Sequence, residues 1–200
     1  IVSPGSISGS HAYSAAGVYV VTVSVTDKIN TTASGAAVGS YRYVVVYDPS
    51  AGFVTGGGWF ISPSGACQLT TVCQSAIGKA NFGFVAKYQK GQSTPDGNTE
   101  FQFQAGNLNF KSTSYDWLVV AGSRAQYKGI GTINGGGKYG FMITAIDGSK
   151  NGGSDLFRMK IWIKNADGTD GPVVYDNQMG AADDGTPTTS LGGGSIQIHN

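Results

Sequence analysis

A period-two pattern of side chains near the amino end constrains the fold of this chain more than any other feature. Residues 17–27 read GVYVVTVSVTD, and residues 41–47 read YRYVVVY. Side chains two positions apart lie on the same face of a β-strand, so each run has one apolar face suited to burial. We call the residues on these faces the assembly face: Tyr19, Val21, Val23, Val25, Tyr41, Tyr43, Val45 and Tyr47.

Two or three strands with one apolar face do not form a stable domain by themselves. We therefore expect the assembly face to be covered by something outside residues 1–50. The cover has three candidate sources: the rest of a longer protein, other strands of this chain, or a second copy of it.

The amino-terminal region resembles the end of a polycystic-kidney-disease-type (PKD) domain, an immunoglobulin-like sandwich common in secreted and surface proteins of bacteria and archaea. The resemblance is carried by the pattern His11-x-Tyr13, Gly17-x-Tyr19-x-Val21 and Val25-x-Asp27. Such domains carry a Trp-Asp-Phe-Gly-Asp-Gly-like segment in their front half, which residues 1–10 lack. The resemblance implies that residues 1–50 are a partial PKD-type sandwich.

Residues 51–200 resemble an all-β module that often follows such domains in bacterial secreted proteins. The matching stretches include GFVTGGGWFISPSGA, GKANFGFVAKYQKG, AQYKGIGTINGGGKYGFMITAIDG and GGGSIQIH. The resemblance implies an extracellular or cell-surface location in a bacterium or archaeon.

Composition agrees with a β-protein rich in tight turns, because 32 residues are Gly and only 12% are charged. The formal net charge of +1 argues against a nucleic-acid partner. A membrane span is not expected either, because no apolar stretch approaches the roughly 18 residues that a spanning helix needs.

Strand-like segments recur after a Pro/Gly break at residues 48–52, with Gly, Pro or Asn between them. Their short, regular spacing predicts an antiparallel β-sandwich or jelly roll over residues 51–200. Residues 180–193 form the longest polar connection and are predicted to be an exposed loop. The predicted strands are 53–61, 78–89, 99–105, 107–112, 115–121, 124–134, 138–147, 156–164, 172–176 and 194–199.

The two cysteines, Cys67 and Cys73, lie in a turn-like insertion between strand signals. We predict a disulfide that closes a short loop, which would indicate an oxidising compartment. The alternative is two reduced, unrelated thiols.

A candidate calcium loop spans residues 147–155, where side chains with oxygen ligands alternate and Gly152 stands sixth. The candidate ligands are Asp147, Ser149, Asn151 and Asp155. The twelfth position is Arg158 rather than Glu, which excludes an EF-hand. The alternative is a hairpin loop whose Asp and Asn side chains bond to the backbone. Arg158 itself is expected to pair with a carboxylate from another strand.

Polysaccharide binding would need an exposed aromatic ring surrounded by polar groups, and Trp162 and Trp59 are the candidates. Met159, Ile161 and Ile163 are predicted to point inward, so Trp162 shares the other face with Arg158, Lys160 and Lys164 and is expected to be accessible. For Trp59 the alternative is a place in the core.

An enzyme is not expected. The histidines, His11 and His199, have no recognisable nucleophile arrangement beside them, and Glu100 is the one glutamate of the chain. The Gly-Gly-Gly runs lack the Lys and the following helix of a phosphate-binding loop.

These observations predict a non-catalytic, extracellular structural protein. It would form filaments or a surface layer by strand complementation, with other copies of itself or other domains of a longer surface protein as partners. The alternative is a carbohydrate-binding or adhesion module of a larger secreted protein, and Ca²⁺ is the one candidate cofactor.

Overall fold

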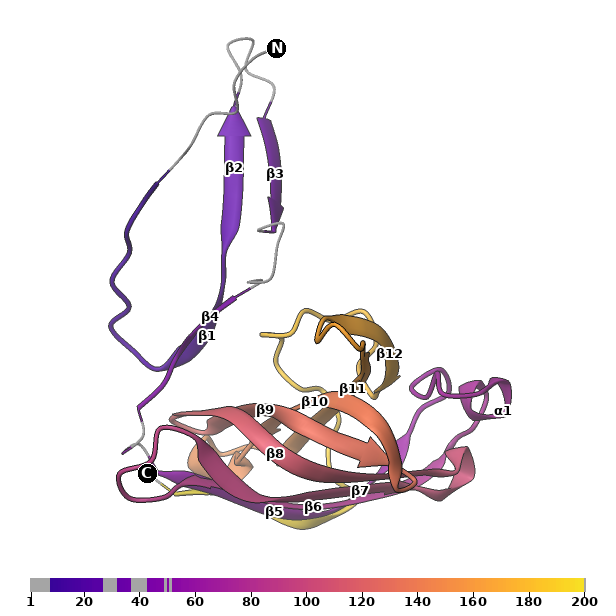
Figure 1. Cartoon of the computed structure of the whole chain (residues 1–200). Helices are drawn as coiled ribbons and strands as arrows, with labels where there is room; N and C mark the ends of the chain where they lie inside the picture. The colour runs from indigo at the N-terminus through magenta and orange to yellow at the C-terminus, as the bar shows by residue number, and fades with distance from the viewer. Residues whose placement is uncertain (1–7, 27–31, 37–42, 49, 51, 200) are drawn as a thin grey trace, which may run out of the picture.

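The computed structural model describes residues 8–26, 32–36, 43–48, 50 and 52–199. At residues 23, 25, 26, 32–36 and 43 it describes the backbone alone. More than half of these residues lie in β-strands and the helices are single short turns, which confirms the predicted all-β class (Figure 1). None of the helices in the described part is long and apolar enough to cross a membrane.

Residues 53–199 form one antiparallel sheet, the main sheet, in which each strand from β5 to β12 pairs with the next one along the chain. The last strand, β13, returns to the opposite edge and pairs with β5. The strands are β5 (Phe53–Ser62), β6 (Gly78–Tyr88), β7 (Pro95–Phe103), β8 (Leu108–Ala121), β9 (Arg124–Ile133), β10 (Gly136–Ile146), β11 (Leu156–Lys164), β12 (Asp170–Asp176) and β13 (Gly193–His199). Short helical turns lie at α1 (Thr71–Gln74), η1 (Gln104–Gly106) and η2 (Gly148–Lys150).

These bounds agree with the predicted segments to within a few residues, with one clear exception. The segments 107–112 and 115–121 are a single strand, β8, whose register shifts between Ser112 and Ser114 and again between Tyr115 and Trp117. The shifts interrupt the alternation of side chains, which is why the sequence reads as two strands.

The main sheet coils so that its inner face closes on itself (Figure 1). Phe157 of β11 stacks on Phe82 of β6 with ring centroids 4.0 Å apart, although these strands are not neighbours in the sheet. The period-two residues of β6 and β7 face this interior: Phe82, Phe84 and Ala86 are buried, as are Phe101 and Phe103. The core is therefore a layer of aromatic rings between two opposed parts of one sheet.

Both edges of the main sheet are covered. Cys67 forms an isolated bridge with Tyr175 of β12, and Gln68 donates its backbone N–H to Val174 O at 2.7 Å. On the side of β13, the other edge strand, Ser190 forms an isolated bridge with Leu156 of β11. Covered edges do not recruit strands from other chains.

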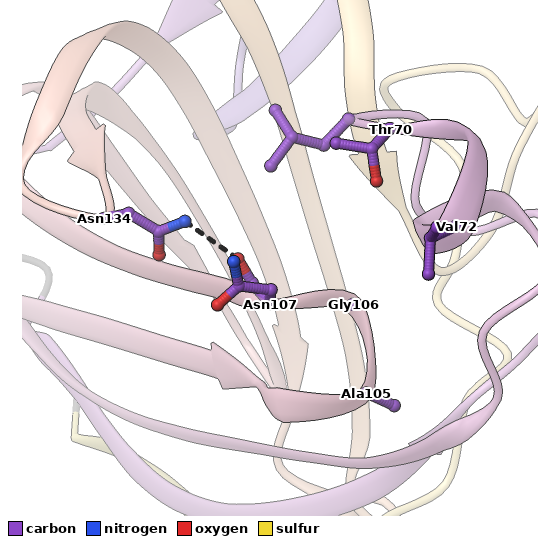
Figure 2. Close-up of a pocket in the computed structure, with 7 residues that line it drawn as sticks. Thr70, Val72, Ala105, Gly106, Asn107 and Asn134 are labelled. Atoms are coloured by element: carbon purple, nitrogen blue, oxygen red, sulfur yellow. Dashed lines mark hydrogen bonds between the residues drawn. The ribbon is translucent and has the colours of Figure 1, made fainter.

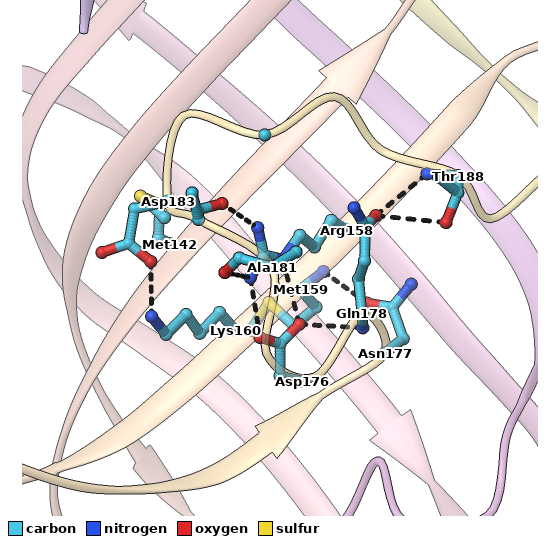
Figure 3. Close-up of polar contacts among 12 residues, drawn as sticks. Met142, Arg158, Met159, Lys160, Asp176, Asn177, Gln178, Ala181, Asp183 and Thr188 are labelled. Carbon is cyan, nitrogen blue, oxygen red and sulfur yellow. Dashed lines mark hydrogen bonds and ion pairs between the residues drawn. The ribbon is translucent and has the colours of Figure 1, made fainter. Parts of the chain in front are cut away.

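The predicted loop at residues 180–193 is present, and half of its residues are exposed, while most of the others are half-buried. Residues 178–190 lie across the outer face of β9, β10 and β11, and this segment buries Arg158, Gln126 and Met142 (Figure 3). Its inward-facing groups bond to the polar side chains beneath it, while about half of its residues face solvent. We call it the covering segment.

The amino-terminal residues form two separate strand pairs, which we call the ribbons (Figure 1). One pairs β1 (Gly17–Val20) with β4 (Tyr43–Val46), and the other pairs β2 (Thr22–Thr26) with β3 (Thr32–Ala36). The predicted continuous run is thus interrupted at Val21, which lies between β1 and β2.

The strand register divides the assembly face. Tyr19 lies opposite Val44, and Val18 lies opposite Val45. Because residues directly opposite each other share a face, Tyr19 and Val45 point to opposite sides of the ribbon. Sequence periodicity orders side chains within one strand, whereas pairing decides which face of the next strand they join. Tyr41 and the side chains of Val23, Val25 and Tyr43 lie outside the described residues.

Candidate functional site

The candidate calcium loop forms a capped turn between β10 and β11. Asp147 accepts from the Ser149 N–H at 3.1 Å and hydroxyl at 2.5 Å, and its other oxygen accepts from the Ile198 N–H at 2.9 Å. Asp155 accepts from the N–H groups of Gly148 at 2.8 Å and Ile196 at 2.7 Å. The two carboxylates therefore hold the open edge of β13 against the β10–β11 turn.

This bonding is the alternative that the sequence left open, in which acidic side chains satisfy backbone groups. Asn151, likewise, accepts from the Gly153 N–H at 3.2 Å. No group of three or more His, Cys, Asp or Glu side chains that could hold a metal ion occurs in the described part of the chain. Calcium binding by Asp147, Ser149, Asn151 and Asp155 stays a prediction.

Several bonds between protein groups lower the pKa of Asp147. Burial raises this pKa, but the hydrogen bonds from the Ser149 hydroxyl and from the N–H groups of Ile198 and Ser149 outweigh it and leave the pKa below its usual value. These hydrogen bonds thus favour the charged form of the Asp147 carboxylate.

Arg158 pairs with a carboxylate from another strand, as predicted. It is fully buried, and its Nε and Nη2 donate to the two oxygens of Asp176 at 3.0 and 2.8 Å (Figure 3). The same guanidinium donates to the backbone oxygens of Ala181 and Ala182 in the covering segment, at 3.0 and 2.6 Å. Arg158 is therefore a structural clamp between β11, β12 and that segment.

The neighbouring polar residues continue this clamp. Asn177, directly after β12, accepts from the Met159 N–H at 2.8 Å and donates to Phe157 O at 3.0 Å. Lys160 forms an ion pair with Asp183, and Gln126 donates to the Asp183 backbone oxygen at 2.6 Å. The polar groups of this cluster thus bond to one another and to the neighbouring backbone.

The expected exposure of Trp162 is wrong. Trp162 retains only 6% exposure. Its ring lies against Gly140 of β10, and Lys128 Nζ lies 5.3 Å from the ring centroid. Lys128 and Lys164 both pair with Asp170 of β12, so an ionic group covers this side of the strand. Ile163, expected to point inward, is instead 38% exposed, in the part of β11 where the pairing with β12 is irregular.

Trp59 lies on the outer face of β5 and is half-buried rather than part of the core. Its ring packs on the backbone of Gly192 and Gly193, where a Cβ at Gly192 would come within 2.3 Å of the ring. Lys79 Nζ lies 4.6 Å from the ring centroid. The glycine runs at 56–58 and 192–194 thus pair β5 with β13 and make room for this indole.

The disulfide between Cys67 and Cys73 is present, as predicted, with a Cα–Cα distance of 5.4 Å. It encloses α1, whose Thr70 side chain accepts from the Cys73 N–H at 3.1 Å. Val72 on α1 is the most exposed large apolar side chain of the insertion. The crosslink holds this small insertion at the end of the main sheet.

Two adjoining cavities lie between this insertion and the turns after β7 and β9. One measures about 300 Å³ and has Thr70 and Val72 on one side and Asn107 and Asn134 on the other (Figure 2). The second measures about 220 Å³ and is lined by Gln102, Gln104, Asn107, Leu108, Asn109 and Asn134. Neither cavity is lined by a charged side chain.

The sequence by itself assigns no role to the amide residues that line these cavities. Asn134 donates to the Asn107 backbone oxygen at 2.8 Å and accepts from the Asn109 N–H at 3.0 Å, which ties the two turns together (Figure 2). The available signal was a run of amide residues near turns, but their meeting depends on the strand register.

No protein-family model, curated protein sequence or solved structure matches this chain. The PKD-type resemblance of residues 1–50 and that of residues 51–200 therefore stay predictions.

Proposed function

We propose that this chain is a non-catalytic structural module of an extracellular or cell-surface protein, and that it assembles into filaments or a surface layer by strand complementation. The carrying observation is the apolar surface of the β1–β4 ribbon. Val20 on β1 is 45% exposed and Val44 on β4 is 37% exposed.

A two-stranded ribbon is marginally stable in water when nothing covers it. Tyr19 and Val44 lie on one side of the ribbon and Val18 and Val45 on the other, so both sides carry apolar groups. In the described residues β1 pairs with β4 alone, and each strand keeps one edge of backbone N–H and C=O groups without a strand partner. A third strand would satisfy that edge and extend the apolar surface.

The contrast with the main sheet supports the ribbons as the place of assembly. Residues 66–68 bond to the edge of β12, and the carboxylates of Asp147 and Asp155 occupy N–H groups on the edge of β13. A strand from a second copy that added to a ribbon would make a head-to-tail contact, and such contacts generate open filaments when the rotation does not close.

Other features support a non-catalytic, exported protein. His199 stacks on Phe53 with ring centroids 4.1 Å apart, and His11 packs edge-on against Tyr13 at 4.7 Å. Neither contact places a base beside a nucleophile. The disulfide favours an oxidising compartment.

The proposal is tested by light scattering after size-exclusion chromatography and by negative-stain microscopy over a range of protein concentrations. The native chain should form extended oligomers as concentration rises. The variant V20K/V44K should remain monomeric, because ammonium groups at these positions would have to be desolvated under an added strand.

The matched control is Ile163→Lys, which changes a similarly exposed apolar residue on β11 of the main sheet. It should assemble like the native chain. A native chain that is monomeric at every concentration, or a V20K/V44K variant that assembles normally, would overturn the proposal.

A further inference from the structure

Outward-facing side chains of four adjacent strands form a row across the outer face of the main sheet. Trp59 of β5 lies opposite Asn81 of β6, Asn81 lies opposite Gln102 of β7, and Gln102 lies opposite Asn109 of β8. Their chain neighbours Phe60, Phe82, Phe101 and Phe110 are buried, so these four side chains all point away from the core. Adjacent strands are about 4.8 Å apart, so the row spans about 14 Å.

The row begins at an indole and ends at the two cavities. Gln102 and Asn109 also line the smaller cavity, which shares Asn107 and Asn134 with the larger one. On one side of the row the paired residues on β5 and β6 are Gly57 and Gly83, which have no side chains. The surface beside Trp59 and Asn81 is therefore low, whereas beside Gln102 and Asn109 the exposed Glu100–Lys111 ion pair borders the row.

The side chains of the row are uncharged, and three of the four are amides. Each side-chain amide offers both N–H donors and a carbonyl acceptor. In the part of the chain that the structure describes, the amides of Gln102 and Asn109 have no hydrogen-bond partner, and both residues are exposed. Groups that both donate and accept match hydroxyl groups, which do the same.

Trp59 supplies an apolar platform at the start of the row. Its ring rests on the Gly192 and Gly193 backbone and is only half-buried. The one charged group over it, Lys79, is an exposed side chain at 4.6 Å that can swing away. An indole stacked against a sugar ring buries the apolar C–H face of the sugar while the hydroxyls point outward.

We propose that the row Trp59–Asn81–Gln102–Asn109, with the cavities at its end, is a binding site for a neutral polysaccharide chain. The chain lies across the strands, stacks one ring on Trp59 and bonds its hydroxyls to the amides. This site lies on the main sheet and not on the ribbons, so polysaccharide binding can be tested independently of filament assembly.

The test is affinity electrophoresis and pull-down of the native chain with neutral polysaccharides (cellulose, chitin, xylan, mannan, dextran) and acidic ones (alginate, hyaluronan). At least one neutral polysaccharide should retain the protein, and retention should change less than about twofold between 0.05 and 0.5 M NaCl because no ion pair is involved. Trp59→Ala and Q102A/N109A should each weaken retention about tenfold or more, with unchanged thermal unfolding as the check on folding.

Two controls make the outcome decisive. Q89A/Q92A removes two exposed amides from the β6–β7 hairpin, outside the row, and should bind like the native chain. Lys79→Ala should bind equally or more tightly, because it uncovers the indole. Retention by no neutral polysaccharide, retention that survives Trp59→Ala and Q102A/N109A, or retention by acidic polysaccharides alone and lost in Lys79→Ala would each overturn the proposal.

Discussion

Arg158 shows how much one buried charge contributes to this fold. Its hydrogen bonds go to β12 and to the covering segment, so the residue joins parts of the chain that are 18 to 24 positions away. A buried guanidinium is tolerated only when its donors are satisfied in this way.

We predict that Arg158→Met lowers the free energy of unfolding by about 3 to 5 kcal/mol, because it leaves the Asp176 carboxylate buried without its counter-charge. Urea denaturation monitored by circular dichroism measures this. The double variant R158M/D176N should recover part of the loss. Lys111→Ala, which breaks the exposed pair with Glu100, should cost less than about 1 kcal/mol. A loss for Arg158→Met as small as that of Lys111→Ala would contradict the structural role.

Asp147 makes stability depend on pH in a defined direction. Its pKa in the folded protein is lowered, so its contribution is present above the unfolded value of about 3.9 and disappears as pH falls through the folded value. We predict that Asp147→Asn lowers stability by about 1 to 2 kcal/mol at pH 7 and that the difference from the native chain shrinks between about pH 4 and pH 2.

Thermal unfolding followed at several pH values measures the effect of Asp147→Asn. Asp116→Asn, at an exposed position of β8, serves as the control and should change stability at pH 7 by less than about 0.5 kcal/mol. A difference between Asp147→Asn and the native chain that persists undiminished at pH 2 would show that the carboxylate charge is not what stabilises the turn.

At the level of elements, the insertion that carries the Cys67–Cys73 disulfide also covers the edge of β12. Residues 66–68 bond to β12, and Cys67 among them is crosslinked to Cys73 of α1. Removing the bond should therefore loosen the seam as well as the loop.

We predict that C67S/C73S lowers the free energy of unfolding by about 2 kcal/mol, the loop entropy of so short a crosslink. The urea midpoint should fall while the m value stays constant. Hydrogen exchange should rise at the Gln68 and Asp176 amides, which bond across the seam, and not at the amides of β8 and β9. An unchanged midpoint, or exchange that rises equally everywhere, would contradict this role.

At the level of the whole molecule, no strand of residues 17–46 pairs with a strand of residues 53–199 in the described part of the chain. Tyr47 provides a contact between the two regions by stacking on Tyr88 at 5.5 Å. The main sheet has its own aromatic core and covered edges, as an independent folding unit requires.

We predict that residues 52–200 fold without the ribbons. This shortened chain should unfold in one cooperative transition within about 2 °C of the midpoint of the main transition in the whole chain, because the contacts of β1 with β8 and of Tyr47 with Tyr88 are few beside those within the main sheet. Differential scanning calorimetry measures both chains. A shortened chain that is unfolded at room temperature would show that the ribbons belong to the same folding unit.

Much of the fold was predictable because the main sheet joins neighbours in sequence. The alternation in residues 82–88 and 101–103 marks buried faces directly, and glycine and asparagine mark the turns between them. The disulfide followed from spacing and composition. The candidate sites were less predictable: Asp147 and Asp155 were recognised as a cluster, but their backbone partners at Ile196 and Ile198 lie more than 40 positions away.

The sequence by itself determined the all-β class, the strand boundaries and the inward faces of most strands, because these depend on local periodicity and turn chemistry. Only the tertiary structure decided which outward faces of the strands remain exposed to solvent. Trp162 and Arg158 carry the same alternation signal as exposed residues, yet the Lys128–Asp170 pair and the covering segment bury them, while Trp59 and the amides of β6 to β8 remain at the surface. The physical reason is that burial depends on what packs over a strand, and that partner comes from elsewhere in the chain.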